Sequence, residues 1–302
     1  MTEATGPERH SESSEPDLIS DPQEVAAAEA RNALRQFDVG MEILDQWLHG
    51  GAGFRLRFTH LLTLNRIVLE GISKLAGTFR PGLIRISNSE HQPPEPTQVP
   101  LLIEDFCDYI NEAFRTKSAL HVAAYALWRL NWIHPFTDGN GRTARVVSYI
   151  LLCARLGYRV PGTPTIPEQI AANKRPYYAA LEQADKAFAG GVIDVSALEK
   201  LLGAHLATQL LNVHDAANNG EEPVEVSAPS SMKNLPVESD VQYQYDDATY
   251  RPVYVISPDQ ILKTARAQSE RNWIEKNPAL VTAIATLIGA IITAITTWLL
   301  TK

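Results

Sequence analysis

The stretch of sequence from His134 to Arg145 reads HPFTDGNGRTAR. It separates two segments of helical periodicity, at about residues 118–133 and 141–156, so the pattern predicts a loop that opens onto a helix N-terminus. The loop gathers a histidine, a carboxylate, two glycines that flank an asparagine, and two arginines. Because binding and catalytic groups concentrate on loops of this kind, the stretch is interpreted as a functional site.

The chemistry of the loop indicates a phosphate site. Gly139 and Gly141 let the backbone approach a ligand closely, and the following helix adds unpaired N–H groups and the positive end of its dipole. Arg142 and Arg145 share a face of the first turn, where they can bind more than one phosphate. Asp138 would repel phosphates unless a divalent cation lay between them, which indicates Mg²⁺.

His134 begins the loop, near enough to act as a general base on an incoming hydroxyl. The whole stretch resembles the signature of the Fic family, His-x-Phe-x-(Asp/Glu)-Gly-Asn-Gly-Arg-x-x-Arg, and matches it at all eight fixed positions. The resemblance covers about residues 25–200. It implies a mainly α fold, a Fic-type helical bundle with a small β-hairpin flap.

The family transfers AMP from ATP to a Ser, Thr or Tyr hydroxyl of a target protein and releases pyrophosphate. The resemblance therefore implies ATP as co-substrate, His134 as the general base and Asp138 as the residue that holds Mg²⁺. It assigns the α-phosphate to the Gly-Asn-Gly turn and the β- and γ-phosphates to the two arginines. These nucleotide-binding residues are Gly139, Asn140, Gly141, Arg142 and Arg145.

Two further segments resemble parts of the Fic fold. Residues 76–80 read AGTFR and precede an alternating stretch that resembles the flap on which the family docks its target. The flap residues are Leu83, Ile84, Arg85, Ile86 and Ser87. Tyr177 and Tyr178 resemble the downstream aromatic residues that can lie against the nucleotide base.

Gly141 narrows the reaction that the resemblance implies. In the Doc branch, which transfers a phosphate, this position is a lysine, so glycine favours AMP transfer. De-AMPylation, phosphocholine transfer or another nucleotide-linked transfer at the same site remain alternatives. An alternative of a different class is a membrane-tethered module that binds nucleotide or peptide without turnover. His134 and Asp138 argue against it, because binding alone requires neither a base nor a metal carboxylate.

The composition is that of a globular protein with additional segments. The chain has 302 residues, 45% of them hydrophobic, and a formal net charge of -8. The acidic balance argues against nucleic-acid binding. Cys107 and Cys153 lie among apolar residues without CxxC spacing, which indicates free buried thiols in a reducing compartment.

Residues 21–212 are expected to form the catalytic domain, and helical patterns cover most of it. In order they are residues 25–37, 41–48, 54–73, 98–115, 118–133, 141–156, 167–188 and 194–212. Asp21 and Pro22 suit the cap and first position of the first helix. Residues 83–87 alternate in period two between proline-containing turns, which predicts a short strand or hairpin.

Both ends of the chain differ in composition from this domain. Residues 1–20 are rich in Glu, Ser and Pro and predict a disordered leader. Residues 213–257 predict a linker, in which a short hairpin is an option, and residues 258–278 a polar juxtamembrane segment. Residues 279–300 carry no charge and are long enough to cross about 30 Å of hydrocarbon as a helix, so they predict a single transmembrane helix. A buried core helix is the alternative.

Basic residues before this span place the catalytic domain in the cytoplasm by the positive-inside rule. They are Lys263, Arg266, Arg271 and Lys276. Within the span, Ala285, Gly289 and Thr293 form a row of small residues that indicates helix pairing and hence a homodimer.

Many members of the family are inhibited by a helix with the pattern (Ser/Thr)-x-x-x-Glu-(Gly/Asn), whose glutamate pairs with the second signature arginine. Glu70 and Gly71 match the end of this pattern, but Arg66 stands where Ser or Thr is needed. The sequence therefore predicts inhibition by a separate partner protein or by another mechanism.

Overall fold

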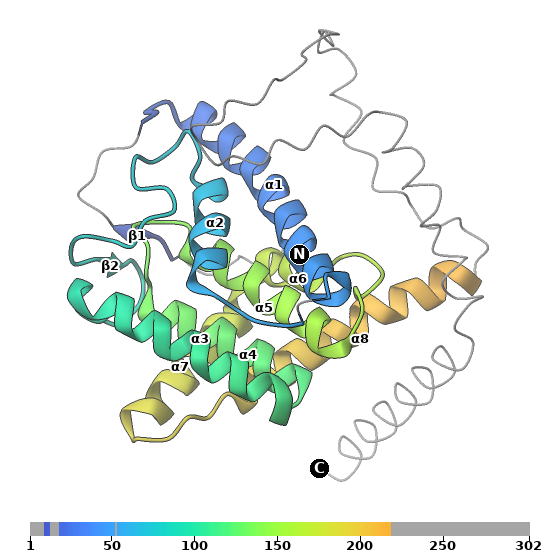
Figure 1. Ribbon diagram of the computed structural model, residues 1–302. Coiled ribbons are helices and arrows are strands. Elements are labelled where there is room, and N and C mark those ends of the chain that lie inside the picture. The colour runs from blue at the N-terminus through green and yellow to red at the C-terminus, as the bar shows by residue number, and fades with distance from the viewer. Residues whose placement is uncertain (1–8, 13–17, 52, 219–302) are drawn as a thin grey trace, which may run out of the picture. The chain divides into compact units, whose positions relative to one another are not determined.

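The computed structural model describes residues 9–12, 18–51 and 53–218 (Figure 1). The chain divides into two units, residues 1–213 and 214–302. The described elements are, in order, β1 (Ser11–Glu12), α1 (Pro22–His49), α2 (Phe58–Val68), β2 (Arg85–Ile86), the 3-10 helix η1 (Pro96–Gln98), α3 (Val99–Thr116), α4 (Ala119–Ile133), α5 (Asn140–Leu156), α6 (Ile166–Ala172), α7 (Lys174–Ala189) and α8 (Ser196–Asn218).

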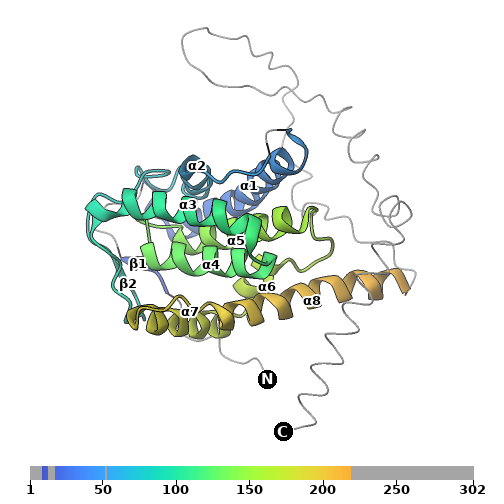
Figure 2. The same ribbon diagram turned by 60° about the horizontal axis from the view of Figure 1, so that its bottom comes forward.

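The helices of the first unit pack in three layers, with α4 and α5 in the middle (Figure 2). Helices α1, α2 and α3 cover one side of this pair, and α6, α7 and α8 lie on the other (Figure 2). The middle pair has the most extensive contact in the unit, and side chains such as Leu127, Val147 and Ile150 are fully buried there. The loop from His134 to Arg145 joins these two central helices, so the best-packed part of the fold holds the predicted site.

Helix α1 is continuous, whereas the sequence predicts two helices at residues 25–37 and 41–48. Gly40 lies inside it and is buried against α5, where an added Cβ would come within 2.7 Å of Val146 Cγ1. The glycine is therefore not a helix end but the residue that allows α1 to approach α5 closely.

The helix expected at residues 167–188 is in fact two helices, α6 and α7, separated at Asn173. Pro176 explains the break. In a continuous helix its ring would clash with the carbonyl of residue 172, and it has no N–H to donate. Asn173 adopts an extended conformation (φ -141°, ψ 92°), and Pro176 then lies in the first turn of α7, where a proline is tolerated.

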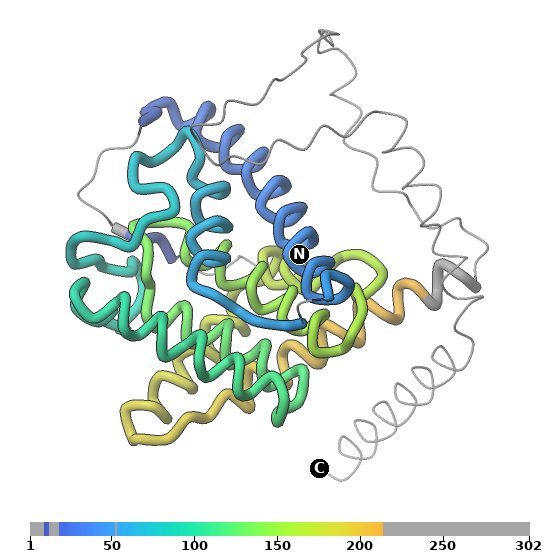
Figure 3. The backbone as a smooth tube through the Cα atoms, viewed as in Figure 1, coloured from blue at the N-terminus to red at the C-terminus, as the bar shows by residue number. Residues whose placement is uncertain are grey.

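The short strand or hairpin expected at residues 83–87 is confirmed only as a short strand, Arg85–Ile86, and its partner comes from elsewhere in the chain, so the β element of the flap is minimal. Asn88 takes a left-handed conformation (φ 55°) and is followed by the prolines at 93 and 94, which cannot donate to a returning strand. Strand β2 pairs instead with β1, antiparallel, although the two lie far apart in the sequence (Figure 3). Residues 9–12 thus depart from the disordered leader expected at residues 1–20.

Helix α8 runs to Asn218 and so continues into the linker expected at residues 213–257. The rest of that linker, the juxtamembrane segment at residues 258–278 and the transmembrane helix at residues 279–300 lie outside the described residues. Among the helices that the structure describes, none combines the length and the hydropathy needed to cross a membrane.

Candidate active site

His134 ends α4 in a left-handed conformation (φ 50°, ψ 60°), which turns the chain sharply into the loop. Its side chain is 6% exposed, and its Nδ1 donates a hydrogen bond to the carbonyl oxygen of Asn131 at 3.2 Å. Because this bond requires the proton on Nδ1, Nε2 keeps its lone pair and is the proton acceptor of the ring.

Burial lowers the pKa of His134 to about 4. The hydrogen bond to Asn131 opposes this shift, as does Asp138, while His91 and Arg80 add to it electrostatically. The imidazole is therefore neutral at pH 7, as a general base must be before it takes a proton.

Arg80 fastens the flap to this histidine and is itself buried. Its Nε donates to the carbonyl oxygen of His134 at 2.8 Å, and its backbone N–H donates to that of Pro135 at 2.9 Å. The other guanidinium nitrogens donate to the carbonyls of Gly82, at 3.0 Å, and Pro94. The sequence did not predict this role of Arg80; it showed only that an arginine lies in the segment before the flap.

Gly139 caps α5 with a left-handed backbone (φ 73°) that favours glycine. A Cβ there would lie 2.8 Å from Val68 Cγ1 and 3.0 Å from Asn65 Nδ2. Asn65 is fully buried, donates to the carbonyl of Asp138 at 2.9 Å and accepts from the N–H of Gly77 at 3.0 Å. The amide thus ties the loop from His134 to Arg145 to the start of the flap segment, a role for Asn65 of α2 that the helical pattern of residues 54–73 did not reveal.

The side chain of Asn140 closes the loop on itself. Its Oδ1 accepts from the N–H of Phe136 at 2.9 Å, and its Nδ2 donates to the carbonyl of Phe136 at 2.8 Å. Since both polar atoms are engaged and the side chain is buried, a nucleotide contact by Asn140 falls to its backbone N–H. The ring of Phe136 is buried as well, which fixes the loop on the core.

Arg142 is held by two carboxylates. Its Nη1 contacts Oε1 of Glu29 at 2.7 Å, and its Nη2 contacts Oδ2 of Asp138 at 2.8 Å. Glu29 belongs to α1 and was not expected at the site, since one acid in an Ala-rich helix gives no signal. The residue that was considered from sequence, Glu70, pairs with Arg35, and both side chains are more than half exposed.

The two tyrosines of α7 have different surroundings. Tyr177 is 2% exposed, and burial raises its pKa. Tyr178 carries the guanidinium of Arg9 4.4 Å above the centre of its ring, and its hydroxyl accepts from the backbone N–H of Arg9 at 3.4 Å. Arg9 also forms an ion pair with Glu182. Both tyrosines line the pocket, but only Tyr178 carries this cation on its ring.

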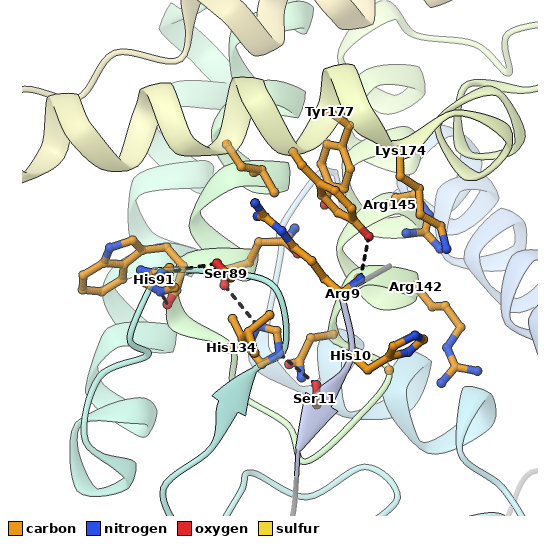
Figure 4. A pocket seen from close by; sticks show the side chains of 18 of the residues that line it. Arg9, His10, Ser11, Ser89, His91, His134, Arg142, Arg145, Lys174 and Tyr177 are labelled. Carbon is orange, nitrogen blue, oxygen red and sulfur yellow. Dashed lines mark hydrogen bonds between the residues drawn. The ribbon is translucent and has the colours of Figure 1, made fainter. Parts of the chain in front are cut away.

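The N-terminal segment enters the site along the flap. Ser11 pairs with Ile86, the N–H of Ser87 donates to the carbonyl of His10 at 2.9 Å, and the N–H of His10 donates to Ser87 Oγ at 2.7 Å. This register places Ser11 Oγ 2.9 Å from Nε2 of His134 (Figure 4). A polar N-terminal segment gave no sign of this contact in the sequence.

The site contains a cavity of about 280 Å³ (Figure 4). It is lined by all nine residues predicted for catalysis, nucleotide and metal, namely His134, Asp138, Gly139, Asn140, Gly141, Arg142, Arg145, Tyr177 and Tyr178. Of the five flap residues only Ile86 lines it; Leu83 is 71% exposed, Ile84 is buried, and Arg85 and Ser87 lie along the strand edge. His91 and Lys174 also line the cavity and were not predicted.

Asp138 is the carboxylate of the loop that could bind a metal, and its side chain is 48% exposed. Within the described residues, no three His, Cys, Asp or Glu side chains are grouped as a metal cage would require. One carboxylate completed by phosphate oxygens and water is the donor set that suits Mg²⁺ and does not suit zinc.

Comparison with known proteins agrees with this geometry. Residues 55–152 match the model of the Fic/DOC family. The chain is 32% identical over 154 residues to the protein adenylyltransferase Fic of Drosophila willistoni (49% of this chain, 29% of the relative). It is 33% identical over 154 residues to that of Drosophila persimilis (49% of this chain, 28% of the relative). These matches span less than a third of the relatives' length.

A solved structure shares the fold. It is a Fic domain containing signaling protein from Bacteroides thetaiotaomicron, with a TM-score of 0.52 at 22% identity, over 64% of this chain and 74% of that one. The likeness to this structure concerns the fold, and the family match concerns residues 55–152, which include the intact loop from His134 to Arg145: this part of the chain is similar to the Fic/DOC family and lies in a Fic-type helical fold.

Proposed function

We propose that the chain transfers AMP from ATP to a hydroxyl of a protein and releases pyrophosphate. One observation carries the proposal: the unprotonated Nε2 of His134 lies 2.9 Å from a serine hydroxyl in a pocket also lined by Arg142 and Arg145 at the start of α5. The relatives named protein adenylyltransferase support it.

In this mechanism His134 takes the proton of the acceptor hydroxyl as the oxygen attacks the α-phosphorus of ATP. The bond from that phosphorus to the bridging oxygen of the β-phosphate breaks, and pyrophosphate leaves. The negative charge of bound ATP raises the pKa of His134 from its depressed value, so the imidazole is a stronger base when the nucleotide is in place.

The remaining residues position and neutralise the nucleotide, which is the main work of a protein in phosphoryl-type transfer. The N-terminus of α5, with Gly139 and Gly141, receives the α-phosphate through backbone N–H groups. Arg142 and Arg145 bind the outer phosphates, and Lys174 adds a cation from α7. Asp138 would hold Mg²⁺, which supplies further neutralisation of phosphate charge when bound.

The test is transfer of label from ATP that carries it on either the α- or the γ-phosphate, with a cell lysate as the source of acceptors. We expect label on protein from the α-position only, lost in His134→Ala. Label from the γ-position alone would contradict AMP transfer. Nucleotide binding without any transfer would favour a binding module without catalytic activity. Release of AMP from modified proteins would favour de-AMPylation.

The place of action is a separate proposal that rests on hydropathy. Residues 279–300 anchor the chain in a membrane, with the catalytic domain in the cytoplasm, where ATP is available. Deletion of residues 277–302 should move the protein to the soluble fraction; an unchanged distribution would contradict the anchor. Crosslinking of the membrane-bound chain tests the homodimer, and co-purification tests the separate inhibitory protein.

A further inference from the structure

The N-terminal segment is bound at the site by three separate sets of contacts. Strand β1 pairs with β2, the backbone of His10 exchanges hydrogen bonds with Ser87, and Arg9 contacts Tyr178 and Glu182. An extended segment that adds a strand to an exposed edge is a general mode of peptide recognition. The chain's own residues 9–12 are thus bound as a peptide substrate would be.

The register of this strand brings one hydroxyl to the base. Ser11 Oγ lies 2.9 Å from Nε2 of His134, within the range for direct proton transfer. Nδ1 of the same ring is occupied as a donor to Asn131, so Nε2 accepts and the serine hydroxyl donates. Ser87, in contrast, uses its hydroxyl to accept from the N–H of His10, which keeps it engaged on the strand.

We propose that Ser11 is a target of the enzyme and receives AMP from the active site of its own chain. The inference rests on the proposed function. The proton of the Ser11 hydroxyl goes to Nε2 of His134, and Oγ forms a bond to the α-phosphorus of ATP. The bond from that phosphorus to the bridging oxygen breaks, so the products are AMP-modified Ser11 and pyrophosphate.

Because Ser11 belongs to the same chain as the active site, its modification should be faster than modification of a second molecule. Only the residues between Ser11 and Pro22, where α1 begins, separate the serine from the folded domain. A short tether of this kind corresponds to an effective concentration in the millimolar range. The modification should therefore be first order in protein and independent of dilution.

Arg9 sets the order of events. Its guanidinium covers the ring of Tyr178, which is the surface expected for the nucleotide base. ATP must displace this side chain, whereas the pairing of Ser11 with Ile86 is made by the backbone and does not depend on it. We therefore expect Ser11 to stay paired with Ile86 when the Arg9 side chain moves off the ring of Tyr178 and the nucleotide base takes its position.

The experiment incubates the purified full-length chain, in detergent, with Mg²⁺ and ATP labelled on the α-phosphate, and locates the modification by peptide mass spectrometry. We expect one AMP on Ser11, its loss in Ser11→Ala and in His134→Ala, and full labelling in Ser14→Ala, a matched serine of the same segment. The rate constant should not change over a hundredfold dilution.

Three outcomes would overturn the inference. Label on lysate proteins but not on Ser11 would leave the proposed function in place and contradict the inference. A rate constant proportional to protein concentration would rule out modification in cis, and so would labelling of the His134→Ala chain by Ser11→Ala at the wild-type rate. No transfer to any protein would remove the proposed function and the inference together.

Discussion

Arg80 donates from Nε to the carbonyl oxygen of His134 at 2.8 Å, so a buried guanidinium in the flap region fixes the backbone of the histidine proposed as the base. That backbone is left-handed at a residue other than glycine, a conformation that costs of order 1–3 kcal/mol and needs support from its surroundings. The flap and His134 are therefore held together by this one side chain.

Arg80→Lys should lower activity through the position of His134. Lysine keeps the charge but cannot reach three carbonyls at once, so the histidine loses its restraint. We expect kcat to fall about tenfold to a hundredfold with little change in KM for ATP. Steady-state kinetics check this, with the surface residue Arg159→Lys as control. A change confined to KM would show that Arg80 acts on binding instead.

Glu29→Gln should strengthen ATP binding. Glu29 and Asp138 both hold Arg142, and phosphate has to compete with them for this guanidinium. Because the Glu29 side chain is partly exposed, its removal is worth about 0.2–1 kcal/mol, or up to about a fivefold decrease in Kd. Calorimetric titration with a non-hydrolysable ATP analogue measures it, and Glu24→Gln on the same helix is the control. An unchanged Kd would contradict the competition.

Arg9→Ala should also favour the nucleotide, because it uncovers the ring of Tyr178. The expected result is a lower apparent KM for ATP with the β1–β2 pairing retained. Arg31→Ala, on the exposed face of α1, is the matched control. If KM rises instead, Arg9 contributes to nucleotide binding and does not compete with it.

Stability should fall as the pH drops from about 6.5 to about 4. The pKa of His134 is lowered to about 4 in the fold from its ordinary value of 6.5, so between these values the unfolded chain binds a proton that the folded chain does not. The loss is on the order of 3 kcal/mol. Denaturant unfolding followed across this range should show it, and the difference between wild type and His134→Asn isolates this residue from other histidines. A difference that does not vary with pH would contradict the assignment.

Gly139→Ala and Gly141→Ala should separate folding from catalysis. At Gly139 the positive φ and the contact with Val68 should cost roughly 1–3 kcal/mol of stability. At Gly141 the nearest atom to an added Cβ is Arg145 Nη1 at 3.4 Å, so folding should be unaffected while the methyl group obstructs the phosphate. Thermal unfolding and AMP transfer, measured on both variants, check the pair. A large loss of Tm in Gly141→Ala would contradict this difference.

The sequence by itself determined the helical character of the domain and the chemistry of the loop from His134 to Arg145. Both are local: helical periodicity repeats within a few residues, and the loop's groups are contiguous in the chain. Local signals also have limits. The break expected between residues 37 and 41 is absent, because Gly40 packs against α5, a tertiary contact that local periodicity does not report. The break at Asn173 is by contrast a local effect of Pro176, which the helical pattern of residues 167–188 concealed.

Only the tertiary structure decided which distant residues complete the site. Glu29, Arg80 and Asn65 reach the loop from other elements through hydrogen bonds and ion pairs that leave no periodic pattern. Strand β1 is the clearest case, because an edge strand pairs through its backbone, so its side chains carry no pattern that identifies the partner strand. The sequence by itself therefore identified His134 as the candidate general base, whereas only the fold showed that Ser11 lies beside it.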